Sequence, residues 1–134
     1  MVKMMKAQIE DAPILLQIQK EAFIKYAKKY GDFESNPYHM DLHRMEFNIK
    51  YRYGQYYKIL DEKSLEMIGG IFCFELDEKP IMKIAQFYFK NGYQHLGYGT
   101  YVLNELFRLN ENVKTWYVDT IMQELSLIHI SEPT

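Results

Sequence analysis

The chain has 134 residues, of which 48% are hydrophobic and 25% are charged, and its formal net charge is −2. This size and apolar content suit one globular domain with its own core and leave little room for a second domain. The nearly balanced charge gives no general attraction to nucleic acid or to an anionic membrane, and no apolar run is long enough to span a bilayer. The single cysteine, Cys73, excludes an internal disulfide framework and favours a reducing, cytoplasmic compartment, with the thiol buried as a packing group.

The first part of the chain predicts a short strand followed by two helices. Val2–Met5 is expected to be the strand, after which Asp11 is expected as a helix N-cap with Pro13 in the first turn. Apolar residues then recur at helical spacing, which predicts a long helix that ends at Gly31. A second helix is expected over Met40–Lys50.

From residue 56 onward the pattern changes to strands that are joined by short turns. We expect strands over Tyr56–Leu60, Leu65–Leu76 and Ile81–Lys90, which would form consecutive antiparallel hairpins. The pair Gly69-Gly70 inside the second of these strands indicates a bulge, or a place where another backbone or a ligand approaches closely.

A helix and a strand follow in the last third of the sequence. We expect the helix over Gly97–Leu109 and the strand over Val113–Asp119, in which Trp116 and Tyr117 would pack on the sheet. A strand, a helix and a strand at this spacing imply a parallel crossover. The predicted fold class is therefore α/β: an antiparallel meander, a parallel pair formed by the fourth and fifth strands, and flanking helices.

The segment Leu125–Thr134 continues none of these patterns. Its sequence resembles a translated sequencing adaptor rather than a segment of a protein, so we exclude it from the fold. The expected organisation is one domain over residues 1–124 and a non-native tail over residues 125–134.

The turn before the predicted third helix carries the most informative residues, Gln94-His95-Leu96-Gly97-Tyr98-Gly99-Thr100. Its glycines let the backbone curl without a Cβ and direct successive N–H groups toward one point. A helix that begins here adds its unsatisfied N-terminal amides and the positive end of its dipole. The turn therefore predicts a binding site for a phosphate or a pyrophosphate.

The spacing Gln94-x-x-Gly97-x-Gly99, after a strand and at the start of a helix, resembles the acetyl-coenzyme A loop of the GNAT family of N-acetyltransferases. The likeness covers residues 2–124, because the predicted elements follow in the family's order, and it implies that the final strands of the fold are missing. It implies that the pyrophosphate is bound by Gln94, His95, Leu96, Gly97, Tyr98, Gly99 and Thr100. It also implies that the fourth strand splays from the fifth and pairs with the pantetheine arm at Phe87, Tyr88 and Phe89.

The resemblance implies an acyltransferase that moves acetyl from acetyl-coenzyme A to a primary amine of a small molecule or peptide by direct attack. It implies no metal, no nucleic acid and no membrane partner, and it allows a homodimer. A backbone N–H of the fourth strand would polarise the thioester carbonyl. The amine must first lose a proton, so a base or a water relay is needed.

No residue stands out as the base. Some family members carry an acidic residue near the start of the fourth strand, whereas Lys83–Gln86 has no carboxylate. Glu75, near the end of the third strand, and Tyr88 are the remaining candidates. The family's usual proton donor is a tyrosine that would fall where the tail begins. A non-catalytic acyl-coenzyme A binding or regulatory module is therefore the alternative to an enzyme.

Other patterns in the sequence have competing interpretations. Gly97-x-Gly99 followed by Asp119 is similar to a dinucleotide-binding fingerprint, but the third glycine of that fingerprint is absent. His39 and His43 have the helical spacing of zinc ligands without a third ligand. The aromatic stretch Tyr51–Tyr57 has too few basic residues for nucleic acid, and it predicts strand packing or an aromatic wall beside a small amine.

Overall fold

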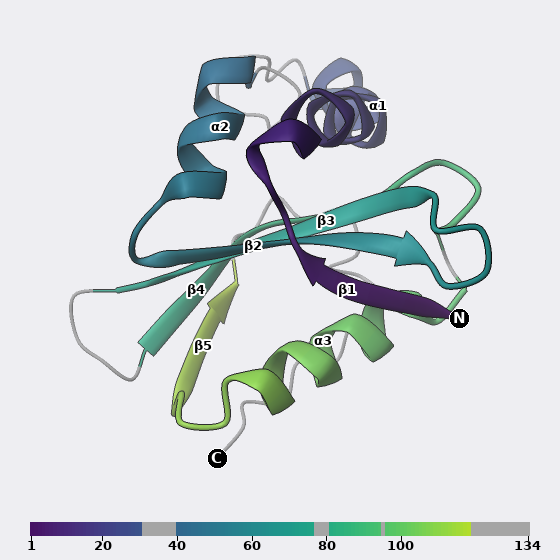
Figure 1. The fold of residues 1–134 in the computed structure, drawn as a ribbon. Coiled ribbons are helices and arrows are strands. Elements are labelled where there is room, and N and C mark those ends of the chain that lie inside the picture. The colour runs from purple at the N-terminus through teal and green to yellow at the C-terminus, as the bar shows by residue number, and fades with distance from the viewer. Residues whose placement is uncertain (31–39, 77–80, 95, 119–134) are drawn as a thin grey trace.

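The computed structural model describes residues 1–30, 40–76, 81–94 and 96–118. Its centre is a single five-stranded sheet with the strand order β1-β2-β3-β4-β5 (Figure 1). The first four strands are antiparallel neighbours, and β5 pairs with β4 in parallel. The strands are β1 (Val2–Lys6), β2 (Gly54–Asp61), β3 (Met67–Glu75), β4 (Ile81–Phe89) and β5 (Thr115–Val118). The predicted mixed sheet with its parallel crossover is confirmed.

Helices cover both faces of the sheet. The helices α1 (Ala12–Tyr30) and α2 (Leu42–Lys50) lie on one face, and α3 (Tyr98–Leu109) lies on the other (Figure 1). A short 3₁₀ turn, η1 (Ile9–Asp11), leads from β1 into α1. None of the helices in the described ranges combines the length and apolarity that a membrane span requires.

Two apolar layers fill the space between the sheet and the helices. The layer under α3 includes Ile59, Ile71, Phe87, Phe89, Val102 and Leu106. The layer under α1 and α2 includes Leu15, Ile18, Phe23, Met45, Phe72 and Tyr88. Because successive side chains of a strand point to opposite faces, Tyr88 faces α1 while Phe87 and Phe89 face α3.

The start of α1 differs from its predicted form. Asp11 is not the N-cap of the helix but the last residue of η1. Its carboxylate accepts a hydrogen bond from the amide of Gln8 at 2.7 Å and pairs with the Lys58 ammonium at 3.0 Å. Asp11 therefore ties the entry of α1 to β2, a long-range contact that the local sequence does not reveal. At α2, Asp41 is the N-cap and accepts from the Arg44 amide at 2.8 Å.

The two glycines of β3 allow a close approach by β4. A Cβ on Gly69 would overlap the carbonyl oxygen of Tyr88, and a Cβ on Gly70 would lie 2.5 Å from the Tyr88 hydroxyl oxygen. The register of β2 against β3 also shifts beside this pair, between Ile59 and Leu60. Both the predicted irregularity and the predicted close approach are confirmed.

A bulge divides β4 into two parts. Phe72 of β3 pairs with Gln86 whereas the next residue, Cys73, pairs with Ile84, so Ala85 is the extra residue. The bulge explains why Ile84 and Phe87 both face α3, although residues an odd number apart on a regular strand point to opposite faces.

The short strand β5 turns its two aromatic residues to opposite faces. Trp116 is 4% exposed and packs against Phe107 of α3, with ring centroids 5.1 Å apart. Tyr117 is 52% exposed, so its predicted packing on the sheet is wrong. The alternation of the strand places Tyr117 on the face opposite to α3, where it remains open to solvent.

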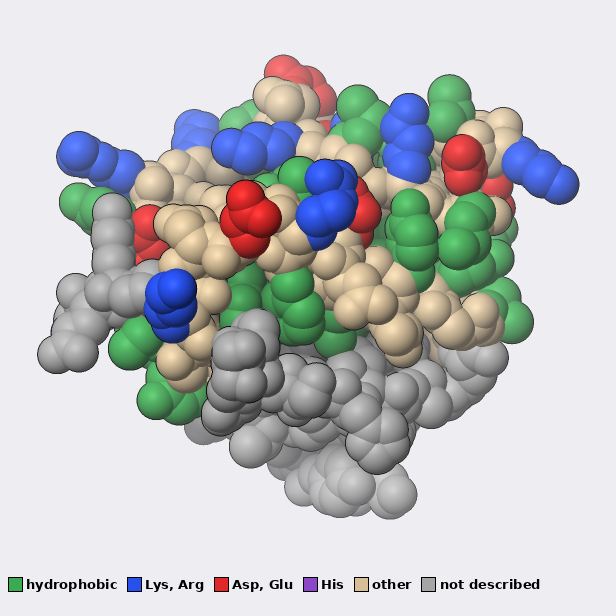
Figure 2. All heavy atoms as spheres, turned by 90° about the horizontal axis from the view of Figure 1, so that it is seen from below, with side chains coloured by type: hydrophobic (Ala, Val, Ile, Leu, Met, Phe, Trp, Pro, Cys, Tyr) green, Lys and Arg blue, Asp and Glu red, His purple; other side chains and the backbone are tan. Residues whose placement is uncertain are grey.

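The outer surface on the α3 side carries acidic and basic side chains mixed with one another (Figure 2). Neither sign forms a continuous patch over the described residues of this face. Binding of nucleic acid draws on clustered basic residues that neutralise phosphates, and the part of this face that the structure describes shows no such cluster.

The hydroxyls of Tyr56 and Tyr88 form a buried pair, with an oxygen–oxygen distance of 2.5 Å. Tyr56→Phe or Tyr88→Phe would leave the other hydroxyl buried without this partner, at a cost of about 1–3 kcal/mol of unfolding free energy. The double variant removes both polar groups, so we expect a loss smaller than the sum of the single losses. Urea unfolding of the four proteins measures the coupling, and strictly additive losses would contradict it.

The buried thiol of Cys73 predicts a loss of stability in alkali. Cys73 is a free cysteine with no exposed surface, and burial raises its pKa to about 12. The unfolded chain releases this proton near pH 8.5 while the folded chain keeps it, so the contribution of Cys73 falls by about 1.4 kcal/mol per pH unit above that point. Cys73→Ala removes this slope. The difference in unfolding free energy between the parent and Cys73→Ala, measured by urea unfolding, should therefore be smaller at pH 10 than at pH 8.

Candidate functional site

The N-terminus of α3 is built on a glycine in the left-handed conformation. Gly97 is the N-cap residue, with φ +81°, and no side chain caps the helix there. The first hydrogen bond within the helix runs from the Tyr101 amide to the Gly97 carbonyl at 3.4 Å. The amides of Tyr98, Gly99 and Thr100 precede this bond and therefore have no acceptor within the helix. These donors and the helix dipole favour an anion at this point.

The space in front of Gly97 is open, because a Cβ built on this residue would meet no atom within 4 Å. The residues present therefore fit the predicted pyrophosphate. The loop has a backbone conformation that favours glycine, free space, and helix-terminal amides whose acceptor must come from outside the helix.

Side-chain contacts tie this loop to the end of β4. The amide nitrogen Nε2 of Gln94 donates to the carbonyl oxygen of Phe89 at 3.1 Å and to Asn91 Oδ1 at 3.2 Å. The rings of Phe89 and Tyr98 are also in contact, with centroids 6.3 Å apart. Gln94 thus acts by positioning the loop. The N-terminal end of α3, whose amides suit an anion, is held beside the carboxyl end of β4, where ligands bind in many open α/β sheets.

The backbone of β4 presents polar groups on the side away from β3. The amide of Lys90 donates to the Ile68 carbonyl of β3 at 2.7 Å. Because hydrogen-bonding direction alternates along an antiparallel strand, the polar groups of Phe89 and Phe87 point away from β3, toward the side on which β5 lies. The ladder between β4 and β5 covers Ile81–Ile84 and ends with the described part of β5 at Val118. The predicted splay at residues 87–89 concerns a β5 continuation that lies outside the described residues.

Tyr88, one of the two predicted catalytic candidates, is enclosed in the core. It has no exposed surface and contacts Phe23 of α1 edge-on, with ring centroids 6.2 Å apart. Burial and the neighbouring Tyr56 raise the pKa of its hydroxyl well above the ordinary value, so the group is neutral at physiological pH. A neutral phenol can donate a hydrogen bond but is not a base.

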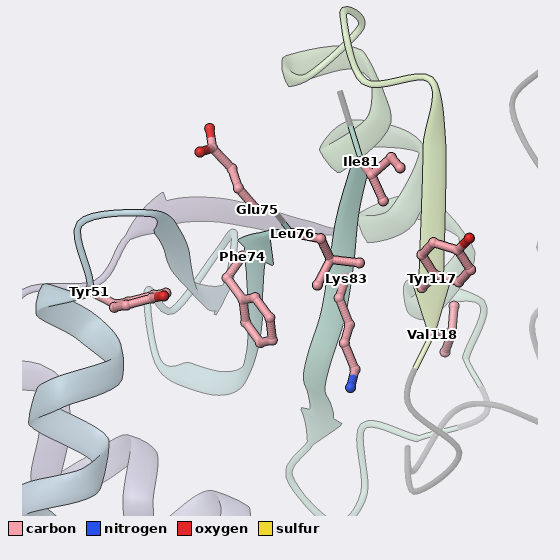
Figure 3. A pocket seen from close by; sticks show the side chains of 8 residues that line it. All are labelled: Tyr51, Phe74, Glu75, Leu76, Ile81, Lys83, Tyr117 and Val118. Atoms are coloured by element: carbon pink, nitrogen blue, oxygen red, sulfur yellow. The ribbon is translucent and has the colours of Figure 1, made fainter. Parts of the chain in front are cut away.

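A groove of about 800 Å³ crosses the sheet on the face opposite to α3. Tyr51 and Phe74 line one side, and Tyr117 and Val118 line the other (Figure 3). Lys83 of β4 extends between them from the floor of the groove. Tyr51 comes from the tyrosine-rich segment after α2, and Tyr117 comes from β5. Segments that are far apart in the sequence therefore supply the aromatic lining of the groove.

Glu75, the other catalytic candidate, lies at the rim of this groove. Its carboxylate points away from Lys83 and Tyr117 (Figure 3), and the residue also borders a smaller cavity of about 230 Å³. Glu75 pairs with Met82 at the start of β4, about 23 Å along the strand from Phe89 at 3.3 Å per residue. Glu75 can therefore act only on a group that reaches the first half of β4.

Gln86 is a polar residue that the sequence analysis did not select. Its side-chain oxygen Oε1 is buried and accepts no hydrogen bond among the described residues. Gln86 and Lys83 share a face of β4, because their partners on β3, Phe72 and Phe74, both pack toward α1 and α2. A buried carbonyl oxygen that lacks a donor is costly.

Most of the remaining sequence candidates cannot be placed in the described part of the chain. The side chain of His43 is 95% exposed and lies 3.8 Å from Glu46, while His39, His95 and Asp119 lie outside the described residues. Over the described ranges, no group of three or more histidine, cysteine or acidic residues could hold a metal.

No protein-family model matches the sequence, and no curated protein sequence matches it. Many solved structures match the fold. A GNAT-family acetyltransferase from Staphylococcus aureus Mu50 is 16% identical, with a TM-score of 0.71 over 95% of this chain and 78% of that chain. PaiA N-acetyltransferase from Thermoplasma acidophilum, solved with coenzyme A, is 14% identical, with a TM-score of 0.64 over 99% and 82%. An aminoglycoside acetyltransferase from an uncultured soil metagenome, solved with sisomicin, is 14% identical, with a TM-score of 0.64 over 94% and 82%.

These likenesses define the class of the fold. The chain has the fold of the GNAT acetyltransferases, as the loop and the order of elements predict. The tie between Gln94 and Phe89 and the glycine at the start of α3 are features of this chain's own structure.

The Gln94 tie predicts how the loop responds to substitution. Gln94→Glu replaces the donor with a carboxylate that faces the Phe89 carbonyl, so we expect the unfolding free energy to fall by about 1–2 kcal/mol. We also expect hydrogen exchange of the Tyr98, Gly99 and Thr100 amides to accelerate. Asn91→Ala, which keeps the Phe89 contact, is the matched control. NMR measures these exchange rates. Equal rates in the parent and in Gln94→Glu would contradict the positioning role of Gln94.

Proposed function

We propose that this chain binds acetyl-coenzyme A at the N-terminus of α3 and transfers its acetyl group to a primary amine of a small molecule or peptide. The observation that carries the proposal is the left-handed Gly97 with three amides ahead of the first helical bond, at the carboxyl end of β4 in an acetyltransferase fold. The coenzyme A complex of PaiA and the sisomicin complex of the metagenomic enzyme support the two ligand classes.

In this proposal the loop and the strand hold different parts of the cofactor. The pyrophosphate accepts from the amides of Tyr98, Gly99 and Thr100, and the peptide groups of Leu96 and His95 are further donors predicted from the sequence. The pantetheine arm runs along the side of β4 on which the backbone groups of Phe87 and Phe89 point. Gln94 contributes by holding the turn against Phe89.

The reaction follows from this arrangement. The neutral amine attacks the thioester carbonyl carbon, a carbon–nitrogen bond forms, and a backbone N–H of β4 stabilises the negative oxygen. The carbon–sulfur bond then breaks, the nitrogen loses its extra proton, and the thiolate leaves or takes up a proton. Glu75 is the candidate for accepting the amine proton through water, whereas the Tyr88 hydroxyl is buried and paired with Tyr56.

A non-catalytic acyl-coenzyme A binding module is the second candidate function. It is favoured because Lys83, and not a carboxylate, lies in the groove at the start of β4. The carboxylate of Glu75 points away from Lys83. Such a module would bind the cofactor through the same loop.

Calorimetry with acetyl-coenzyme A, followed by detection of free thiol across a panel of amines, tests the proposal. Binding with release of thiol supports an acetyltransferase, and binding without release supports the module. No binding of acetyl-coenzyme A, or a preference for a nicotinamide dinucleotide, would overturn both.

The glycine at the start of α3 allows a matched test. Gly97→Ala places a methyl group in the open space and strains a backbone with φ +81°, so we expect affinity for acetyl-coenzyme A to fall at least tenfold and stability to fall by about 1 kcal/mol. Gly92→Ala carries the same kind of strain, with φ +94° and equally open space, but lies before the loop. We expect it to lose similar stability and keep its affinity. Equal affinities for Gly97→Ala and Gly92→Ala would argue against the site.

A further inference from the structure

Four aromatic rings in contact with one another lead from α2 to the groove. The ring of Phe47 stacks on that of Tyr51, with centroids 5.6 Å apart. Tyr51 in turn contacts Tyr53 and Phe74, whose ring centroids lie 6.0 Å and 6.2 Å away. We call Phe47, Tyr51, Tyr53 and Phe74 the aromatic strip. Its outer rings are open to water, because Phe47 is 53% exposed and Tyr53 is 48% exposed. Tyr51 and Phe74 also line the groove, so the strip leads into it (Figure 3).

Two arginines lie over the outer rings of the aromatic strip. The guanidinium carbon of Arg44 is 5.2 Å from the centroid of the Phe47 ring, and that of Arg52 is 5.4 Å from the centroid of the Tyr53 ring. Within the described ranges, no carboxylate forms an ion pair with either arginine. A guanidinium that stacks on a ring still directs its N–H groups outward from its edge, where they can bind a carboxylate through two parallel hydrogen bonds. The strip therefore combines an apolar face with donors that suit carboxylates.

The acidic residues near the start of α2 do not neutralise these arginines. The Asp41 carboxylate caps the helix by accepting from the backbone amide of Arg44, and Oε1 of Glu46 lies 3.8 Å from Nδ1 of His43. An exposed apolar patch that combines aromatic residues with arginine is typical of a protein interface. Since the charge beside this patch is positive, a partner with apolar and acidic side chains is complementary to it.

We propose that the aromatic strip is a docking surface for a peptide acceptor in which apolar and acidic residues follow the amine. The apolar side chains pack on the rings of the strip, and the carboxylates bind Arg44 and Arg52. The amine enters the groove past Tyr51 and Phe74. This inference rests on the proposed acetyl transfer and names its substrate class, the amino end of a peptide or protein. The strip contributes to binding and takes no part in the chemical step.

Three hexapeptides with a free amino end and an amidated carboxyl end test the proposal on the full chain. The first alternates phenylalanine with glutamate, and the other two have glutamine or arginine in place of glutamate, so each carries one primary amine. Calorimetry in the presence of coenzyme A should show that the glutamate peptide binds roughly tenfold more tightly than the glutamine peptide, with the arginine peptide weakest. We expect kcat/KM for thiol release from acetyl-coenzyme A to follow the same order. Added salt should weaken the glutamate peptide most, because exposed charge pairs are screened.

Substitutions separate the charges of this surface from its rings. Arg44→Gln and Arg52→Gln should each weaken binding of the glutamate peptide by about threefold to tenfold and leave the glutamine peptide unchanged. Phe47→Ser should weaken both peptides alike, because the apolar side chains of each lose a ring to pack on. Arg108→Gln removes the same charge from α3, on the opposite face of the sheet, and is the matched control that should change neither affinity (Figure 1). All four positions are exposed, so the melting temperatures should stay close to that of the parent.

The possible outcomes are distinguishable from failure of the proposed function. If coenzyme A binds and the small amine phenethylamine is acetylated as efficiently as the glutamate peptide, the substrate class is wrong and acetyl transfer stands. Equal affinities for the three peptides, or a glutamate preference that survives both Arg44→Gln and Arg52→Gln, would overturn the aromatic strip as the docking surface. If coenzyme A does not bind, the proposed function fails, and calorimetry of the peptides with the unloaded protein still decides on the strip. A glutamate preference that the arginine substitutions remove would support docking there, and its absence would overturn it.

Discussion

The close contact between Tyr88 and the glycine pair of β3 is the constraint on which the rest of the structure depends. Neither Gly69 nor Gly70 has room for a Cβ against Tyr88, so the observed register of β4 against β3 requires glycine at both positions. That register turns Tyr88 toward α1 and its neighbours toward α3. It also directs the backbone groups of Phe87 and Phe89 away from β3, toward the edge where a cofactor arm could pair.

The bulge at Ala85 then divides β4 between two tasks. Beyond the bulge the strand ends at the glycine-initiated helix, where backbone amides suit an anion. Before the bulge it carries Lys83 into a groove with aromatic walls. One strand therefore links a helix end whose backbone amides suit an anion to a groove that is lined by side chains. Substitutions in the groove should leave the loop undisturbed, because the two regions share no side chain.

Local patterns were sufficient for the elements and for the loop. Helical spacing, the glycine pair of β3 and the Gln94-x-x-Gly97-x-Gly99 turn predicted the order of strands and helices and the position of the helix N-terminus. Contacts between distant segments were not predictable. The Asp11–Lys58 pair depends on how η1 meets β2. The exposure of Tyr117 depends on which face of β5 is covered, and the face on which Gln86 lies depends on a bulge that is defined only by pairing with β3.

The contact between Trp116 and Phe107 has a practical consequence. The chain contains one tryptophan, and it lies where β5 meets the carboxyl half of α3. Its indole is almost fully withdrawn from water. The fluorescence emission of Trp116 therefore reports whether α3 is packed against β5. The opposite end of the same helix presents the backbone amides of the loop. A red shift would signal that the strand–helix–strand unit has come apart, even while the meander of β1 to β3 remains folded.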